Sequence, residues 1–116
     1  MAKAHKVKAG EGEFRRLALE LPSVLESAHM GHADFRVVKG KKTRIFATLS
    51  GLEKGYGVVM LTLEQQQEFR RERPEIFAPV PGGWGRGGST MMRLVADEET
   101  MRGALNTAHG NAERKL

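Results

Sequence analysis

Five basic side chains are crowded into one short stretch of the sequence, around a Lys-Gly dipeptide. They are Arg36, Lys39, Lys41, Lys42 and Arg44. Ammonium and guanidinium groups at this spacing can bind the phosphates of a nucleic acid, along its backbone or as a wing beside a groove. The other interpretation is a charged strand edge that keeps the sheet from pairing with a second chain. The stretch therefore predicts either a nucleic-acid contact or a protected edge.

A glycine-rich segment contains the single tryptophan of the sequence. Residues Gly83 to Gly88 spell G-x-G-x-x-G, but a dinucleotide-binding loop needs a strand before it and a helix after it. Here a proline-containing segment precedes the glycines and a predicted strand follows, and no lysine follows them as in a P-loop. We interpret the segment as a turned loop in which Trp84 can stack on a base and Arg86 can contact a phosphate. Packing of Trp84 over the sheet is the alternative.

Glu26, His29 and His32 have the spacing E-x-x-H-x-x-H, which raises the question of a metal site. Histidine ligands on a helix usually lie four residues apart, whereas this segment is predicted to be strand and turn, with Gly31 between the histidines. A spacing of three on a strand directs the two side chains to opposite faces, and a closed zinc site needs a fourth ligand. We therefore predict no metal, and a structural, hydrogen-bonded role for His29.

No arrangement of nucleophile, base and acid is recognisable, so we expect no catalytic residues and no cofactor. Glu64, Glu68 and Glu72 recur every four residues as one solvated helix stripe. Cysteine is absent, which excludes disulfides, thiolate catalysis and cysteine-ligated zinc and favours a reducing cytoplasm. The sequence predicts a binding protein and not an enzyme.

Positive charge is concentrated in the first part of the chain. The net charge is +5 over 116 residues, with ten Lys and Arg against five Asp and Glu in residues 1–44, and nine against nine in residues 45–116. A one-sided basic surface attracts polyanions. No apolar stretch is long enough for a membrane helix, and the N-terminus lacks the apolar run of a secretory signal. We expect a cytoplasmic protein with a flexible basic tail over residues 1–10 and one domain over residues 11–116.

The spacing of apolar residues predicts the elements that position these side chains. Thr62 and Gln65 form a capping-box pair, Asp97 caps the last helix, and Gly110 is predicted to end it. Helices are predicted over 11–21, 63–73 and 98–110, strands over 24–30, 34–38, 41–49, 57–62 and 90–95, a tight turn at 39–40 and a loop over 79–89. The order α-β-β-β-β-α-β-α indicates an α+β two-layer sandwich, an antiparallel sheet with helices packed on one face.

Taken together, several segments resemble the MmcQ/YjbR-like family. They are Leu19 to Pro22 with Glu26, His29 to Val37, Ile45 to Leu49, Pro74 to Phe77, Trp84 to Thr90 with Arg93 and Leu94, and the helix from Asp97 to Ala108. The resemblance implies a CyaY/frataxin-like fold, and a double-wing DNA-binding motif has been described for some members. In this chain the wings would be residues 36–44 and the loop that holds Trp84 and Arg86.

Two departures limit what the resemblance implies. Iron handling by true frataxins needs an acidic ridge on the first helix, where this chain interrupts its glutamates with Arg15 and Arg16. Members of the family often have a tryptophan in the last helix, where this chain has His109. Neither role is carried over, and a fold alone does not supply a function.

The sequence favours a sequence-tolerant nucleic-acid-binding domain, with DNA or another nucleic acid as the partner. The predicted binding residues are Arg36, Lys39, Lys41, Lys42, Arg44, Trp84 and Arg86. The alternative is a non-catalytic module that binds a protein or a small ligand, with residues 29–36 and the Trp84 loop lining one shared surface.

Overall fold

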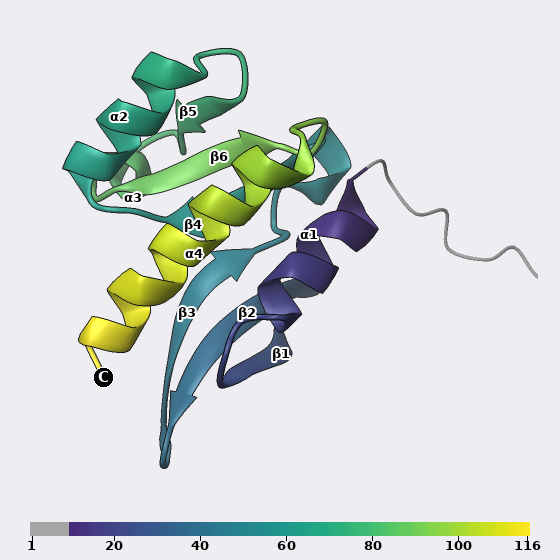
Figure 1. Cartoon of the computed structure of the whole chain (residues 1–116), viewed down its shortest axis with the longest axis vertical. Coiled ribbons are helices and arrows are strands. Elements are labelled where there is room, and N and C mark those ends of the chain that lie inside the picture. Colours follow the sequence, from purple (N-terminus) through teal and green to yellow (C-terminus); the bar gives the residue numbers. More distant parts are fainter. Residues whose placement is uncertain (1–9) are drawn as a thin grey trace, which may run out of the picture.

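The computed structural model describes residues 10–116, so the tail predicted over residues 1–10 lies outside the described residues except for Gly10. The long elements follow the predicted order, with one 3₁₀ turn, a short strand and a one-turn helix added (Figure 1). The bounds are α1 Glu11–Leu19, β1 Val24–His29, β2 His32–Lys39, β3 Lys42–Thr48, η1 Leu52–Lys54, β4 Tyr56–Met60, α2 Leu63–Glu72, β5 Phe77–Pro79, α3 Gly83–Arg86, β6 Ser89–Arg93 and α4 Glu98–Arg114.

Six antiparallel strands form one sheet in the order β1-β2-β3-β4-β6-β5, with the apolar strand β4 in the interior. β2 pairs with β3 along most of its length, but β3 meets β4 only through the pairs Ala47–Val59 and Thr48–Val58. The β2–β3 hairpin therefore runs on past the last residue pair that joins it to the rest of the sheet. Figure 1 shows its turn projecting beyond the body of the molecule.

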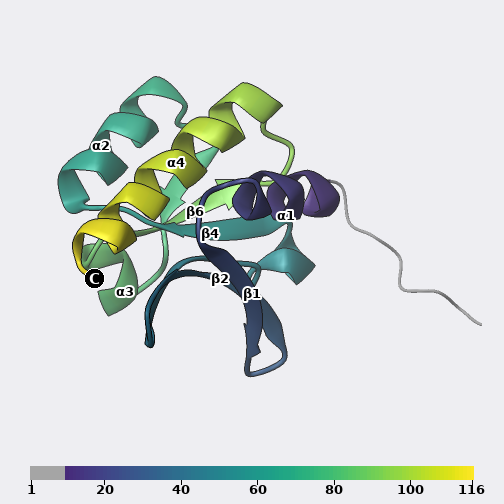
Figure 2. The ribbon, with the colours of Figure 1, turned by 60° about the horizontal axis from the view of Figure 1, so that its bottom comes forward.

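The helices cover one face of this sheet, which confirms the two-layer α+β sandwich. α4 crosses β3 and β4, α1 packs beside α4, and α2 packs against β5 (Figures 1 and 2). Large side chains that meet in this layer are fully buried: Phe14, Phe35, Phe46, Met92, Met101 and Leu105. Each contributes about 1.5–3 kcal/mol relative to an exposed side chain. The core thus fixes the faces of β2 and β3, and the alternate residues of these strands point away from the helices.

Two predicted boundaries are wrong. α4 continues past Gly110 to Arg114, because Ala112 is buried in the core and the Asn111 side chain donates a hydrogen bond to the carbonyl oxygen of Met60 at 3.1 Å. The segment predicted as a loop over 79–89 contains the end of β5 and the helical turn α3. Both errors arise where tertiary contacts outweigh the local preference of glycine for turns.

No helix in the described part of the chain is long and apolar enough to cross a membrane.

Candidate nucleic-acid interface

The turn of the β2–β3 hairpin presents a group of exposed lysines. Lys39 and Lys42 are directly opposed across the two strands, and Lys41 lies between them beside Gly40, whose φ of +62° suits the tight turn. All three lysines are exposed, and no acidic residue of the part of the chain described by the structure pairs with them. Directly opposed like charges repel each other. The turn therefore concentrates positive charge that nothing in residues 10–116 compensates.

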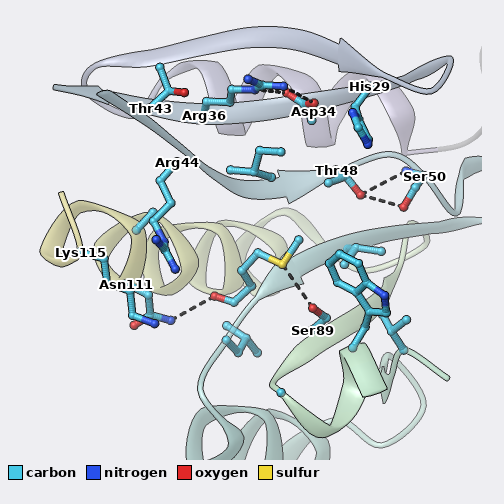
Figure 3. A pocket seen from close by; sticks show the side chains of 18 of the residues that line it. His29, Asp34, Arg36, Thr43, Arg44, Thr48, Ser50, Ser89, Asn111 and Lys115 are labelled. Carbon is cyan, nitrogen blue, oxygen red and sulfur yellow. Dashed lines mark hydrogen bonds and ion pairs between the residues drawn. The ribbon is translucent and has the colours of Figure 1, made fainter. Parts of the chain in front are cut away.

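A cleft lies beside the face of β2 that points away from the core, where the hairpin diverges from β4. Its volume is about 1210 Å³, and it is bounded by the β1–β2 turn, by β2, β3 and β4, by α3 and by the last turn of α4 (Figure 3). The alternation of β2 explains the position, because Phe35 and Val37 point into the core while Asp34 and Arg36 line the cleft. Most of the surface of the cleft is apolar, with Ile45 and Val58 among its lining residues.

Asp34 and Arg36 form a two-point ion pair inside this cleft. The Nε of Arg36 donates to Oδ1 of Asp34 at 2.9 Å, and Nη2 donates to Oδ2 at 3.1 Å. The hydrogen bonds to Asp34 raise the pKa of the Arg36 guanidinium above its ordinary value. Asp34 is only 1% exposed, and Arg36 is the cation that compensates its buried carboxylate. Arg36, predicted as a phosphate contact, is therefore already engaged by a carboxylate.

Arg44 lies apart from Arg36, at the end of the cleft formed by α4. Figure 3 shows its side chain extending toward Asn111 and Lys115 in the last turn of that helix. Arg114, which also lines the cleft, donates to the Oδ1 of Asn111 at 2.7 Å. Of the residues lining the cleft within 10–116, four are Lys or Arg and one is a carboxylate, so this apolar cleft has a positive field.

Trp84 lines the cleft and is 72% exposed, so the alternative in which it packs over the sheet is wrong. It is the second residue of α3, and Arg86, two residues on, is exposed but is not among the residues that line the cleft. The structure thus brings Trp84 and Arg44 to one cleft, and it places Arg86 outside that cleft.

The one-turn helix α3 is held by a buried glutamine of α2. The Nε2 of Gln66 lies 3.1 Å from the carbonyl oxygens of both Gly85 and Ser89, and 3.0 Å from Oγ1 of Thr90. Thr90 donates its own hydroxyl to the carbonyl oxygen of Gly88, so all three neighbours accept, which fixes the orientation of the amide. A Cβ at Gly85 would overlap the carbonyl oxygen of Val80. Gly85 therefore serves close backbone packing, which positions Trp84.

The β1–β2 turn corrects the prediction for the two histidines. His29 and His32 are paired directly across a two-residue turn, so they lie on the same face of the sheet, not on opposite faces. Glu26, however, binds Arg15 through two contacts of 3.1 and 3.2 Å, and no group of three metal-ligating side chains exists among residues 10–116. Both histidines line the cleft.

Met30 occupies a strained position in the same turn. Its φ is +52° and that of Gly31 is +81°, a combination that glycine and asparagine adopt far more easily than methionine. The Met30 side chain is also 84% exposed at the mouth of the cleft. Met30 thus adds apolar surface to the edge of the cleft.

Sequence reasoning missed several residues of this site. The pairing of Asp34 with Arg36 can be predicted from the sequence, because residues two apart on a strand share a face. Gln66 and Lys115 cannot be predicted in this way, since most other residues of the site lie far from them in the sequence. His109, where the family resemblance implies a tryptophan, is buried against Phe46, and its Nε2 lies 2.8 Å from the carbonyl oxygen of Pro22.

Comparisons with known proteins identify a protein of the same fold. The chain matches no protein-family model and no curated protein. Its structure is similar to the crystal structure of Deinococcus radiodurans protein DR2400, with a TM-score of 0.72 and 20% sequence identity, over 87% of this chain and 76% of that one. DR2400 is a DUF419 domain protein, and DUF419 is the MmcQ/YjbR-like family. The fold of this chain is therefore that of a known MmcQ/YjbR-like domain.

Proposed function

We propose that this chain is a member of the MmcQ/YjbR-like family that binds nucleic acid without sequence preference and without catalysis. The observation that carries the proposal is a set of four free cations, which we define as Lys39, Lys41, Lys42 and Arg44. They are exposed on the projecting hairpin and have no acidic partner within residues 10–116. A nucleic acid, which carries one negative charge for each nucleotide, is a partner that compensates such a row of charges.

The geometry favours phosphate contacts over reading of base edges. Lysine side chains on an exposed turn act as flexible point charges, and such contacts position a protein on the backbone and carry no sequence information. Arg36 uses two of its five N–H donors on Asp34, which also compensates its charge, so it attracts a phosphate less than the free cations do. A cytoplasmic location remains a prediction of the sequence.

The salt dependence of binding tests the proposal. With four phosphate contacts, the logarithm of the association constant is expected to fall against the logarithm of salt concentration with a slope of about −4 for duplex DNA and about −3 for a single strand. Fluorescence anisotropy of a labelled duplex, a labelled single strand and a labelled RNA, titrated between about 50 and about 200 mM salt, measures this slope. Undetectable binding at the lowest salt, or affinity that salt leaves unchanged, contradicts the proposal.

A second candidate function is binding of a small ligand, and the apolar cleft favours it. Its volume of about 1210 Å³ exceeds the roughly 300–1,000 Å³ that is usual for ligand sites, so a small ligand would occupy part of it. A ligand held mainly by apolar contact would bind with little dependence on salt, and its binding would survive exchange of Lys39, Lys41 and Lys42. The same salt titration therefore separates the two functions.

A further inference from the structure

We propose that the cleft takes an unpaired base of a single-stranded nucleic acid against Trp84, so that the domain prefers single strands to duplexes. The inference rests on the proposed function and deepens it, because it names the form of nucleic acid that fits. Two observations support it: the exposed Trp84 side chain on the anchored helical turn α3, and the positive charge of the cleft.

The indole ring of Trp84 is exposed to solvent. An aromatic side chain that is 72% exposed loses contact with water when a base stacks on it, and every base has a π-face for that contact. The ring is presented by α3, whose Gly85 carbonyl oxygen accepts from Gln66, and the same amide also contacts Ser89 and Thr90 of the strand that follows α3. A buried anchor of this kind reduces the entropy lost on binding, because the platform is already ordered.

Basic side chains lie beside the apolar walls of the cleft. Arg44 and Lys115 lie together at the α4 end of the cleft, and neither has an acidic partner within residues 10–116 (Figure 3). The single carboxylate among the lining residues, Asp34, is already paired with Arg36. A base on Trp84 would therefore have cations available for its flanking phosphates, which is the combination found where single strands bind.

A duplex cannot place a base against Trp84 without losing a base pair. In a duplex each base is stacked and paired, so it can reach a ring inside a cleft only after extrusion from the helix, which costs free energy. The lysines at the hairpin turn can contact either form, since phosphates are accessible on single strands and on duplexes. The hairpin therefore supplies general affinity, and the cleft supplies the preference for single strands.

Trp84 is the single tryptophan of the sequence, so its fluorescence reports on the cleft alone. The experiment titrates the protein with an oligothymidylate of about 15 nucleotides, with the duplex of the same sequence and with thymidine monophosphate. We expect the single strand to quench the emission and to bind at least about tenfold more tightly than either alternative. Equal affinity for the strand and the duplex, or for the strand and the mononucleotide, overturns the inference.

Two variants complete the test. Trp84→Ala is expected to weaken single-strand binding roughly 5- to 150-fold while changing duplex binding less than about twofold, and Trp84→Phe, which keeps an aromatic ring, is expected to retain most of the affinity. Because the ring is exposed, both variants should fold, and their thermal unfolding checks this. Unchanged single-strand binding by Trp84→Ala overturns the inference and leaves the proposed function standing. Absence of binding to every nucleic acid overturns both.

Discussion

The side-chain nitrogen of Gln66 lies 3.1 Å from the carbonyl oxygen of Gly85, and this contact joins α2 to the turn that carries Trp84. Gln66 is 3% exposed and satisfies a second carbonyl oxygen, that of Ser89, with the same amide. A polar side chain in this position has a structural task, because its backbone acceptors are out of reach of water. The relationship links a buried residue of one helix to the exposed ring proposed to bind a base.

Replacement of this amide is expected to destabilise the protein. Gln66→Leu removes the hydrogen bonds from the amide to Gly85, Ser89 and Thr90, while the two carbonyl oxygens keep the backbone N–H groups of Gly88 and Val80 as donors. We expect a loss of about 0.5–1.5 kcal/mol in the free energy of unfolding. Urea denaturation followed by circular dichroism measures the loss. Gln67→Leu is the matched control, since Gln67 is the exposed neighbour on the same helix and its exchange should change stability little. Equal effects of the two variants would contradict the role of Gln66.

Arg36→Gln is expected to affect stability more than binding. It leaves the buried carboxylate of Asp34 without its ion-pair partner, and because Arg36 is partly exposed we expect a loss of about 1–3 kcal/mol, below that of a fully buried pair. Its effect on nucleic-acid affinity should be smaller than that of Lys42→Gln, since the Lys42 charge is free. A larger loss of affinity from Arg36→Gln would place the phosphate site inside the cleft and contradict the assignment.

Met30→Asn is expected to stabilise the β1–β2 turn. Asparagine tolerates the left-handed backbone at this position better than methionine does, which predicts a gain of about 0.5–1 kcal/mol. Gly31→Ala provides the counterpart, because its φ of +81° strains any side chain and predicts a loss. The free energies of unfolding of both variants measure these effects. A destabilised Met30→Asn variant would show that the exposed Met30 side chain supplies packing that outweighs the strain.

Acid is expected to weaken the fold through the cap of α4. Hydrogen bonds from the Thr100 side chain and backbone, followed by one from Arg73, lower the pKa of Asp97 to about 2. Because the pKa is lower in the folded state, the stabilisation is complete above about pH 4 and is lost as the pH falls toward 2. Asp97→Asn keeps a capping side chain but does not titrate. Its urea midpoint should therefore fall less than that of the wild type between pH 4 and pH 2, and an identical fall would contradict the prediction.

The regular fold was predictable because its signals are local. The apolar spacing of Phe14 and Leu17, the capping box at Thr62 and Gln65, and Asp97 before the last helix each indicate an element, and each is confirmed. The glycines near Trp84 misled the prediction, since the sequence does not say which backbone carbonyl approaches Gly85. Contacts between distant segments, such as Asn111 with Met60, decide where α4 ends.

The candidate site was predictable in its residue types but not in its grouping. The basic residues from 36 to 44 appear as one cluster in the sequence, yet the structure divides them among a cleft ion pair, a hairpin turn and a cationic cleft end. The division follows from the alternation of strand faces and from the Phe35–Arg36 register shift between β2 and β3. The approach of Lys115 to Arg44 depends on how α4 crosses the sheet, which no local pattern specifies.

The central claim is that the lysines of the hairpin turn bind phosphates. The most direct test compares Lys39→Gln/Lys41→Gln/Lys42→Gln with a control that removes the same charge elsewhere, Lys54→Gln/Arg70→Gln/Arg71→Gln, in salt titrations with a single strand. All six residues are exposed. The hairpin variant is expected to bind at least about tenfold more weakly at low salt, with its salt slope reduced from about −3 to about −1, while the control keeps the wild-type slope. Equal slopes for the two variants would contradict the account.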